Sequence, residues 1–450
     1  MRIVPPLRFV MSCRPNALAA VAAALAVSVG LVVAASAADK DAGPGPLLPL
    51  LPAQAPPLPK PGPLAQPRSR DQVGFPEALT KSIMPPGSPL TPALVALGAK
   101  LFFESRLSDD GTVACATCHD PGRAFTDGRP ASIGVHGKVG QRNAPTVLNA
   151  LYNQTQFWDG RAHTLEQQAA LPITNPFEMG SATIGDAVAR IADDQEYQEQ
   201  FKQAFGRGVN EQDMLRAIAT YERTLVSFDS PFDHFIAGDR NAVSDSAKRG
   251  WELFNTKARC NLCHALTDNQ RDATVLTDND FHNIGVGIVR HRVVPLAQQA
   301  ERDLAQGNLK DIDRAAIETP LSALGRFLIT HKETDMASFK TPDIRNVLVT
   351  SPYFHDGSQQ TLWDVVDHYN KGDGLTDFWL DEDIQPLALT EPEIDNLVAF
   401  MASLTSPQYK ALGDAEFARQ LALSKTSRPQ RDTTRAFGPK PSRPKPPPLP

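Results

Sequence analysis

The chain has 450 residues, of which 41% are hydrophobic and 21% charged, a composition typical of a globular protein and not of a fibrous, multi-span membrane or disordered one. The formal net charge is −6, and no cluster of Lys and Arg occurs in the middle of the chain, which argues against nucleic-acid binding. At about 100–200 residues per domain the length predicts two domains, and 39 prolines indicate additional linker or tail.

Residues 1–37 have the pattern of an export signal peptide. Arginines precede an uninterrupted run of small apolar residues from Ala17 to Val33, and a small-residue cleavage site ends at Ala37. We expect cleavage after Ala37 and a periplasmic protein. The alternative is an uncleaved membrane anchor, because the apolar run approaches the ~20 residues that span a bilayer. Membrane contact is expected only in that case.

Residues 38–74 are predicted to be a proline-rich linker. Ten of the 25 residues from Gly43 to Pro67 are proline, which favours an extended spacer and not a packed element.

Two identical cysteine patterns follow. Each is C-x-x-C-H, the attachment pattern of c-type haem, in which two thioethers hold the porphyrin and the histidine ligates the iron. Every cysteine outside the signal belongs to one of them, so the sequence predicts two covalently bound haems. The motifs are Cys115-Ala116-Thr117-Cys118-His119 and Cys260-Asn261-Leu262-Cys263-His264.

Three other uses of these cysteines fit less well. A thioredoxin-like site would need a βαβ setting, and neither motif follows a strand-like run. A zinc ribbon would place its cysteine pairs about 15–20 residues apart, whereas 141 residues separate Cys118 from Cys260. A disulfide within each motif would leave the following histidine unexplained both times.

A short repeat precedes each motif. Gly98-Ala99-Lys100-Leu101-Phe102 stands 13 residues before the first motif, and Gly250-Trp251-Glu252-Leu253-Phe254 stands six before the second. The repeat predicts two related cytochrome c domains in tandem, over residues 75–235 and 236–423.

The apolar periodicity between and after the motifs is helical. Asn210 is placed to cap a helix with Asp213 at its third position, and Thr390 with Glu393 makes a capping box for another. Long alternating strands are missing, so the predicted fold is all-α, with two tandem c-type cytochrome domains that each bind one haem covalently. The apolar faces of the two helices are Met214, Ile218, Tyr221 and Leu225, and Ile394, Leu397, Met401 and Leu404.

Two segments stand outside this repeat. Residues 289–326, rich in Arg, Asp and Gln, look like an insertion in the second domain that covers one haem or meets a partner. Residues 424–450 are predicted to be a basic, proline-rich tail, since seven Lys/Arg and eight prolines occur there with one acidic residue.

A polar and aromatic block between the motifs indicates a site. It places a tryptophan, an amide and a carboxylate within one helix-turn unit, more than packing alone needs. The block runs from Gln156-Phe157-Trp158-Asp159-Gly160-Arg161 through Leu165, Gln168 and Pro172 to Asn175-Pro176-Phe177-Glu178-Met179.

Over roughly Leu101 to Leu404 the chain resembles the bacterial di-haem cytochrome c peroxidases and their MauG-type relatives. The resemblance implies that the haem on His119 is peroxidatic and that the haem on His264 transfers electrons. It rests on both motifs at the family's separation, the Trp158 to Met179 block, Arg142-Asn143-Ala144-Pro145-Thr146, and Phe339-Lys340-Thr341-Pro342 through Arg345-Asn346 to Pro352-Tyr353-Phe354-His355-Asp356-Gly357.

The resemblance also implies catalytic roles. Hydrogen peroxide must lose a proton from one oxygen and gain it on the other as the O–O bond breaks, which asks for a carboxylate and an orienting amide. Glu178 matches the acid/base position and Gln168 its companion; helix-surface polarity is the alternative. Trp158 matches the tryptophan between the haems, where it would relay electrons, although a core aromatic is compatible with the same position.

A calcium site between the haems is implied by three matching residues, Asn143, Thr350 and Pro352. Side-chain and backbone carbonyl oxygens suit a hard cation. Each residue alone would be read as a turn residue.

The second ligand of the second iron separates two branches of the family. In the peroxidases proper it is a methionine, and the matching position here, 16 residues beyond Tyr353, is Tyr369. This resembles the MauG-type proteins, and a phenolate would lower the potential of that haem relative to a thioether. A core role for Tyr369, or ligation by His368, Met336 or Met401, stays open.

The second ligand of the first iron is harder to assign from the sequence. Members of the family close it at rest with a histidine from a loop after the first motif, and His136 is displaced by one residue against that pattern. His136 would therefore bind reversibly, line the access channel or have no role.

Taken together, the resemblance implies an exported di-haem c-type peroxidase of the MauG-like branch, an oxidoreductase that reduces hydrogen peroxide to water with electrons entering through the C-terminal haem. Its electron donor would be a small protein, a cytochrome c or a cupredoxin. Two alternatives stay open: oxidation of a side chain on a partner protein, and a non-catalytic di-haem electron carrier. An acid/base residue beside the iron argues against the carrier.

Overall fold

The computed structural model of the protein describes residues 56–69, 72, 84–85, 89–266, 275–287, 293–307, 309, 311–372 and 379–427. The chain divides into two units, Met1–Leu51 and Pro52–Pro450, and all described residues belong to the second. The predicted signal peptide and its cleavage after Ala37 lie outside the described residues. Within the described part of the chain, no helix combines the length and the apolar character needed to cross a bilayer.

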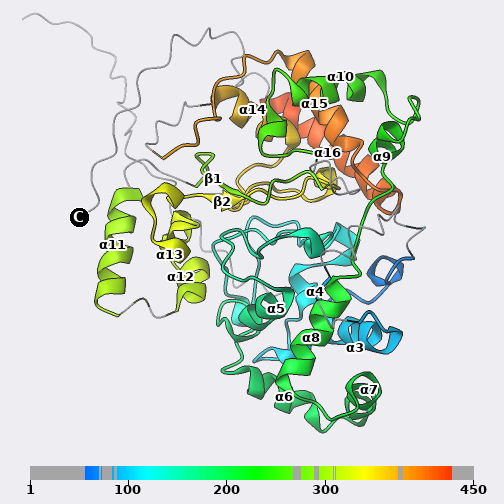
Figure 1. Ribbon diagram of the computed structural model, residues 1–450, viewed down its shortest axis with the longest axis vertical. Coiled ribbons are helices and arrows are strands. Elements are labelled where there is room, and N and C mark those ends of the chain that lie inside the picture. Colours follow the sequence, from blue (N-terminus) through cyan, green and yellow to red (C-terminus); the bar gives the residue numbers. More distant parts are fainter. Residues whose placement is uncertain are drawn as a thin grey trace, which may run out of the picture. The chain divides into compact units, whose positions relative to one another are not determined.

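Helices make up almost all the regular structure of the described residues, and the predicted all-α fold is confirmed (Figure 1). The first half holds α3 (Pro92–Phe102), α4 (Cys115–Cys118), α5 (Leu165–Thr174), α6 (Ile184–Ala192), α7 (Gln195–Phe205) and α8 (Glu211–Glu222). The second half holds α9 (Pro231–Ile236), α10 (Asp245–Asn255), α11 (Val293–Ala305), α12 (Ile312–Glu318), α13 (Phe327–Thr330), α14 (Leu362–Lys371), α15 (Glu391–Ala402) and α16 (Lys410–Ser427).

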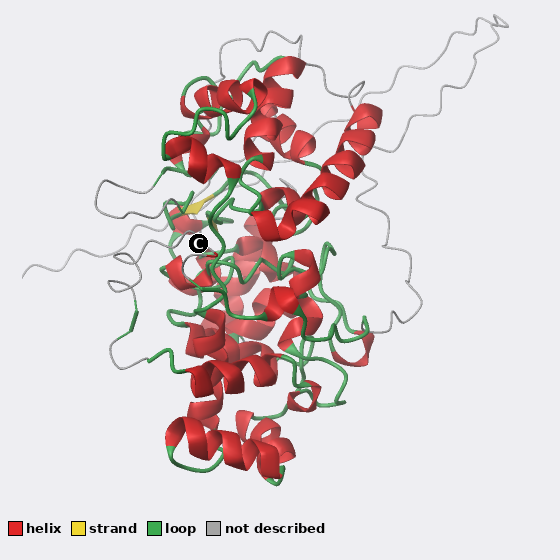
Figure 2. Ribbon diagram, turned by 90° about the vertical axis from the view of Figure 1, so that its right-hand side faces the viewer, coloured by secondary structure: helices red, strands yellow, loops and turns green. Residues whose placement is uncertain are grey.

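One short ladder interrupts the helices. β1 (Phe281–His282) pairs antiparallel with β2 (Phe339–Lys340), with Phe281 opposite Lys340, and it is the small yellow element in Figure 2. Strands of this length cannot form a sheet layer, so the ladder only ties the segment after the second motif to the segment before α14.

The repeat ahead of each motif corresponds to two equivalent helix pairs. α3 packs on α8, and α10 packs on α15 (Figure 1). A Cβ on Gly98 would overlap the carbonyl oxygen of Ala217, and a Cβ on Gly250 would overlap that of Asn396. The repeated glycine therefore lets two helix backbones touch in each pair.

Both predicted helix starts are confirmed. The side chain of Asn210 accepts a hydrogen bond from the backbone N–H of Asp213 (3.0 Å), and Glu393 accepts one from the backbone N–H of Thr390 (2.8 Å). The two predicted apolar faces are buried in separate hydrophobic cores, one shared with α3 and the other with α10. The first core contains Met214, Ile218, Tyr221 and Leu225, and the second contains Ile394, Leu397, Met401 and Leu404.

The segment predicted as an insertion forms a helical unit with its own core. Residues of α11, α12 and α13 pack together there, among them Ala297, Ala316 and Phe327. This core also includes the fully buried Met336, so the unit extends beyond the predicted end at residue 326.

The two ends of the folded body differ from the prediction. Pro63–Ala65 form a 3₁₀ helix in the expected spacer, and the buried carbonyl of Ala65 accepts a hydrogen bond from the Tyr221 hydroxyl (2.5 Å). Leu58 packs on the same core. Residues 58–65 of the predicted linker are therefore packed on the first core. At the other end α16 continues to Ser427, into the predicted tail.

Candidate active site

The first motif opens onto a cavity of about 1910 Å³, part of which is open to solvent. Its wall is completed by residues from the second half of the chain, including Ile344 and Tyr353. The cavity brings together most of the site residues predicted from the sequence. They are Cys115, Cys118, His119, Asn143, Trp158, Gln168, Glu178, Thr350 and Pro352.

The residues of the first motif fit a covalently held haem. Cys115 and Cys118 are free thiols. Burial raises the pKa of the Cys118 thiol to about 12, so the sulfur stays protonated and is a poor ligand for a metal ion. Nδ1 of His119 bonds the carbonyl oxygen of Phe125 (3.1 Å), which leaves Nε2 available to an iron. The cavity beside them provides the space that a porphyrin needs.

Glu178 lines this cavity with an unpaired carboxyl oxygen. Its Oε2 is buried and has no hydrogen-bond partner among the described residues. Burial, reinforced by the charge of Asp313, raises the pKa of Glu178 to about 8, while Arg161 and Arg142 oppose the rise. A carboxyl group with this pKa can accept and return a proton near neutral pH, as an acid/base group must.

The backbone around Glu178 is fixed from two sides. The carbonyl oxygen of Asn175, just past the end of α5, accepts a hydrogen bond from the N–H of Glu178 (3.0 Å). The N–H of Val135 donates to the carbonyl oxygen of Glu178 (2.9 Å). A Cβ on Gly134 would overlap that same carbonyl, so glycine allows the loop after the first motif to pass this closely.

A buried ion-pair network lies beside Glu178. Asp159 accepts hydrogen bonds from Arg142 (2.5 Å) and Arg161 (3.0 Å). Burial would raise the pKa of Asp159, but the two guanidinium groups outweigh it and lower the pKa to about 2. Nη2 of Arg161 is buried and has no hydrogen-bond partner in the described part of the chain. Arg161 therefore offers the cavity an unused donor.

Trp158 lies between residues of the two halves of the chain. Its Nε1 donates to the carbonyl oxygen of Asn143 (2.9 Å), and its own carbonyl accepts from the N–H of Lys340 (2.7 Å). Its ring meets His355 edge-on, with 6.5 Å between centroids. Burial lowers the pKa of His355 well below its usual value, so this neighbour is neutral. The indole is held in one orientation on the cavity wall.

The three predicted calcium ligands line the same cavity. Nδ2 of Asn143 donates to the carbonyl oxygen of Arg129 (2.7 Å), which leaves Oδ1 as the remaining ligand atom of that side chain. The hydroxyl of Thr350 donates to Val347 (3.1 Å), and Pro352 follows a cis peptide bond. All three residues line the same cavity, and calcium binding stays a prediction.

The second motif is built like the first. Cys260 begins a 3₁₀ helix, Cys260–Leu262, and Nδ1 of His264 bonds a backbone carbonyl oxygen (2.9 Å), leaving Nε2 available. Tyr369 of α14 lies near both thiols. Burial, with smaller contributions from Cys263 and Cys260, raises the pKa of Tyr369. The predicted ligand is therefore placed beside the second motif.

The alternatives to Tyr369 have other contacts. Nε2 of His368 bonds the carbonyl oxygen of Ile284 (2.8 Å). Met336 is buried in the core of the insertion, and Met401 is buried in the core of α10 and α15. These contacts favour Tyr369.

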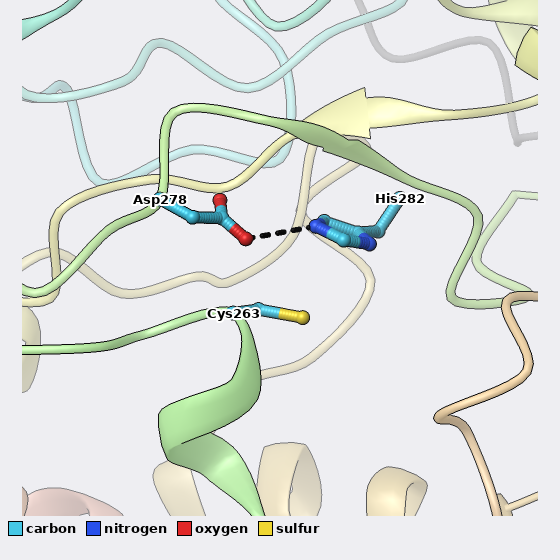
Figure 3. Close-up of side chains that lie close together, drawn as sticks. All are labelled: Cys263, Asp278 and His282. Atoms are coloured by element: carbon cyan, nitrogen blue, oxygen red, sulfur yellow. Dashed lines mark hydrogen bonds and ion pairs between the residues drawn. The ribbon is translucent and has the colours of Figure 1, made fainter.

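One cluster near the second motif has the composition of a metal site. Figure 3 shows Cys263, Asp278 and His282, whose candidate ligand atoms all lie within 4.8 Å of one another. His282 bonds Asp278 (3.0 Å) and Asp381 (2.6 Å), and these bonds raise its pKa to about 12. A protonated imidazole has no lone pair for a metal ion, so the cluster is an ion-pair arrangement beside the attachment motif.

His136 is not among the residues that line the cavity. Its side chain is 53% exposed, and Nε2 lies 3.3 Å from a carboxylate oxygen of Asp109. Nδ1 lies 3.5 Å from Asp110. The structure therefore does not bring His136 together with the other predicted site residues.

Three charged residues at or beside the cavity were not predicted as site residues from the sequence. Oε2 of Glu222, at the end of α8, is buried without a described partner, and burial raises its pKa to about 8. Burial lowers the pKa of Lys340 to about 8. Neither Glu222 nor Lys340 lies in an apolar run that would have indicated its burial. Asp313 had no local signal either, because its partner Arg161 is distant in sequence.

Known proteins are similar to this chain in sequence and in fold. A family model described as di-haem cytochrome c peroxidase matches residues 92–241. The methylamine utilization protein MauG of Methylophilus methylotrophus is 37% identical over 323 residues, 71% of this chain and 84% of the relative. The cytochrome c peroxidase Ccp of Escherichia coli (strain K12) is 35% identical over 69% of this chain and 57% of its own length. The crystal structure of a MauG-like protein associated with microbial copper homeostasis matches with a TM-score of 0.59 and 32% identity, covering 72% of this chain and 92% of that one.

Proposed function

Because the chain belongs to the di-haem cytochrome c peroxidase family, we propose that it is an exported, periplasmic peroxidase of the MauG-like branch that reduces hydrogen peroxide to water. The observation that carries this proposal is Glu178, a buried carboxyl group with an unpaired oxygen on the cavity of the first attachment motif. In this proposal Cys115 and Cys118 hold one haem covalently, and Cys260 and Cys263 hold the other.

A haem held by Cys115, Cys118 and His119 would supply the iron and the electrons for the overall change H₂O₂ + 2e⁻ + 2H⁺ → 2H₂O. Glu178 accepts the proton of one peroxide oxygen at Oε2 and returns it to the oxygen that leaves as water. Nη2 of Arg161, which is buried and unused, donates a hydrogen bond to the oxygen that gains negative charge. Gln168 of α5 orients the peroxide.

The remaining predicted residues serve electron transfer. His264 and Tyr369 would hold the iron of the C-terminal haem, which would take up the electrons. Trp158 relays them, which its fixed indole between residues of both halves supports. Asn143, Thr350 and Pro352 would hold a calcium ion. The donor is a small cytochrome c or cupredoxin.

A second candidate function is the oxidation of a side chain on a partner protein. Tyr369 at the ligand position and the 37% identity to a MauG protein favour it. Both functions use the same cavity and the same proton transfer at Glu178, so they differ in the source of the electrons. The non-catalytic carrier is disfavoured, because a pure relay has no use for a buried, unpaired carboxyl group at one haem site.

The test is an absorption and EPR spectrum of the purified ferric protein before and after one equivalent of hydrogen peroxide. We expect a high-spin and a low-spin component, with the high-spin component converting within mixing time. Two low-spin signals that ignore peroxide would contradict the proposal and favour the carrier. Turnover with reduced cytochrome c as the only electron source would then separate the peroxidase from a protein-oxidising enzyme.

A further inference from the structure

The insertion from the second half of the chain docks against the cavity of the first motif. Ile317 of α12 lines this cavity, and a Cβ built on Gly140 would lie 3.3 Å from the Ile317 side chain. Ser322 accepts hydrogen bonds from Nε (3.0 Å) and Nη2 (3.1 Å) of Arg142. Arg326 donates to the carbonyl oxygen of Asp159 (2.9 Å). The insertion is thus part of the pocket wall.

Within this wall Asp313 contacts the groups around Glu178. Its Oδ1 accepts from Nε of Arg161 (2.8 Å), and its Oδ2 accepts from Nδ2 of Asn175 (2.7 Å). Arg161 is one of the charged neighbours of Glu178, and the carbonyl oxygen of Asn175 accepts a hydrogen bond from the backbone N–H of Glu178. The Asp313 carboxylate, whose side chain is 12% exposed, therefore anchors both the arginine beside Glu178 and the turn that bears Glu178.

We propose that Asp313 is the positioning residue of the peroxidatic pocket, supplied by the insertion: it holds Arg161 and Asn175 in place, and through them the acid/base group Glu178. The inference rests on the proposed function for the role of Glu178. The insertion was expected from the sequence to cover one haem or to meet a partner. In this inference it supplies a residue that positions the acid/base group of the first half.

The charges around Glu178 set the direction of the effect. Arg142 and Arg161 face Glu178 from the loops before α5, Asp313 faces it from α12, and the neutral thiol of Cys118 faces it from α4. The arginines favour the carboxylate and Asp313 favours the protonated form. Removing the charge of Asp313 leaves the arginines unopposed, so the pKa of Glu178 falls from about 8 toward its ordinary value.

The experiment uses the haem-loaded protein and the variant Asp313→Asn, which keeps the shape of the side chain. The carboxyl C=O infrared band of Glu178, identified by its loss in Glu178→Gln, is titrated with pH. We expect its midpoint in Asp313→Asn to lie about one unit lower, a tenfold loss of proton affinity. The pH profile of the peroxide reaction should move by the same amount in the same direction, and Asp313→Glu should restore both.

Glu318→Gln is the matched control, because it removes a carboxylate of the same helix that pairs with Arg314 (2.8 Å) and does not line the cavity. It should leave both midpoints unchanged. An unchanged infrared midpoint in Asp313→Asn would overturn the inference, as would an equal loss of rate at every pH. Asp313→Ser gives the same comparison if Asp313→Asn does not fold. If Glu178→Gln retains full turnover, the proposed function fails, while the infrared titration still decides the role of Asp313.

Discussion

At the scale of single residues, the cavity wall contains a carboxyl group with a buried oxygen that makes no hydrogen bond to the described residues. A buried polar atom without a partner costs free energy, and such atoms are rare in folded proteins. Glu178 meets this condition and stands between two arginines and an aspartate, so its proton affinity is set by opposing charges and not by burial alone. That balance is what a proton-transfer group requires.

Replacing Glu178 by Gln removes the proton acceptor and keeps the size of the side chain. We expect peroxide turnover to fall by about 10²–10⁴-fold, the usual contribution of an acid/base group, while the spectra of both haems persist. The measurement is steady-state turnover with an added electron donor. Glu166→Gln is the control. Glu166 lies on the same helix as Gln168 but pairs with Arg223 (2.8 Å), so this substitution should leave turnover unchanged. Full turnover in Glu178→Gln would remove it from the mechanism.

Replacing Tyr369 by Phe removes the hydroxyl beside the second motif. We expect the absorption and EPR signals of the second haem to change and its potential to rise, because a phenolate stabilises the ferric state more than a neutral ligand does. The signals of the first haem should not change. Tyr197→Phe, which removes another buried hydroxyl, one that bonds Glu104 (3.0 Å), should alter neither haem. An unaltered second haem in Tyr369→Phe would exclude tyrosine ligation.

At the scale of secondary-structure elements, the same contact is used twice. Each attachment motif follows a helix whose glycine touches the backbone of a later helix, α8 in the first half and α15 in the second. The contact has no room for a methyl group, whereas glycine inside a helix is otherwise unfavourable by about 1 kcal/mol relative to alanine. Close packing of the helix pair outweighs that intrinsic cost.

The substitution Gly98→Ala should therefore destabilise the protein although alanine favours helix formation. We expect the free energy of unfolding to fall by about 1–3 kcal/mol, the usual cost of overpacking. Gly185→Ala in α6 is the control, since its new Cβ would meet the flexible end of Glu211 at 3.0 Å and lie at ordinary contact distance, 3.5 Å, from the hydroxyl of Thr183. It should be neutral or stabilising. Denaturant unfolding followed by circular dichroism measures both, and equal effects would contradict the helix-contact argument.

At the scale of the whole molecule, three buried carboxyl groups make stability depend on pH in opposite directions. The pKa of Asp159 is lowered to about 2, so its contribution is present above the ordinary value of 3.8 and is lost as pH falls. The pKa values of Glu178 and Glu222 are raised to about 8 from 4.5, so their contribution is present in acid and is lost as pH rises toward 8.

The double variant Glu178→Gln and Glu222→Gln should therefore gain stability relative to the wild type as the pH rises from about 5 to about 8. Each unit of raised pKa corresponds to about 1.4 kcal/mol, so each of the two groups should contribute up to about 5 kcal/mol to the difference between the two proteins. The measurement is the free energy of unfolding of both proteins across this pH range. Two parallel curves would show that neither carboxyl group is held protonated by the fold.

Much of the molecule was predictable because its signals are local. The two C-x-x-C-H motifs, the caps at Asn210 and Thr390 and the apolar faces of their helices depend on residues a few positions apart. The caps and the apolar faces are confirmed, and haem attachment at the motifs stays a prediction. The helical period also argued against long strands, and among the described residues the two-residue strands β1 and β2 were not predicted.

The sequence by itself determined the number of haem motifs, the all-α class and most of the candidate site residues that the first cavity brings together. Only the tertiary structure decided that Asp313 bonds Arg161, that Ala65 in a proline-rich segment is buried, and that His136 stays off the cavity wall. The physical reason is that motifs, caps and helix faces are set by near neighbours along the chain. Burial, ion pairing and proton affinity depend instead on segments that meet only when the chain folds.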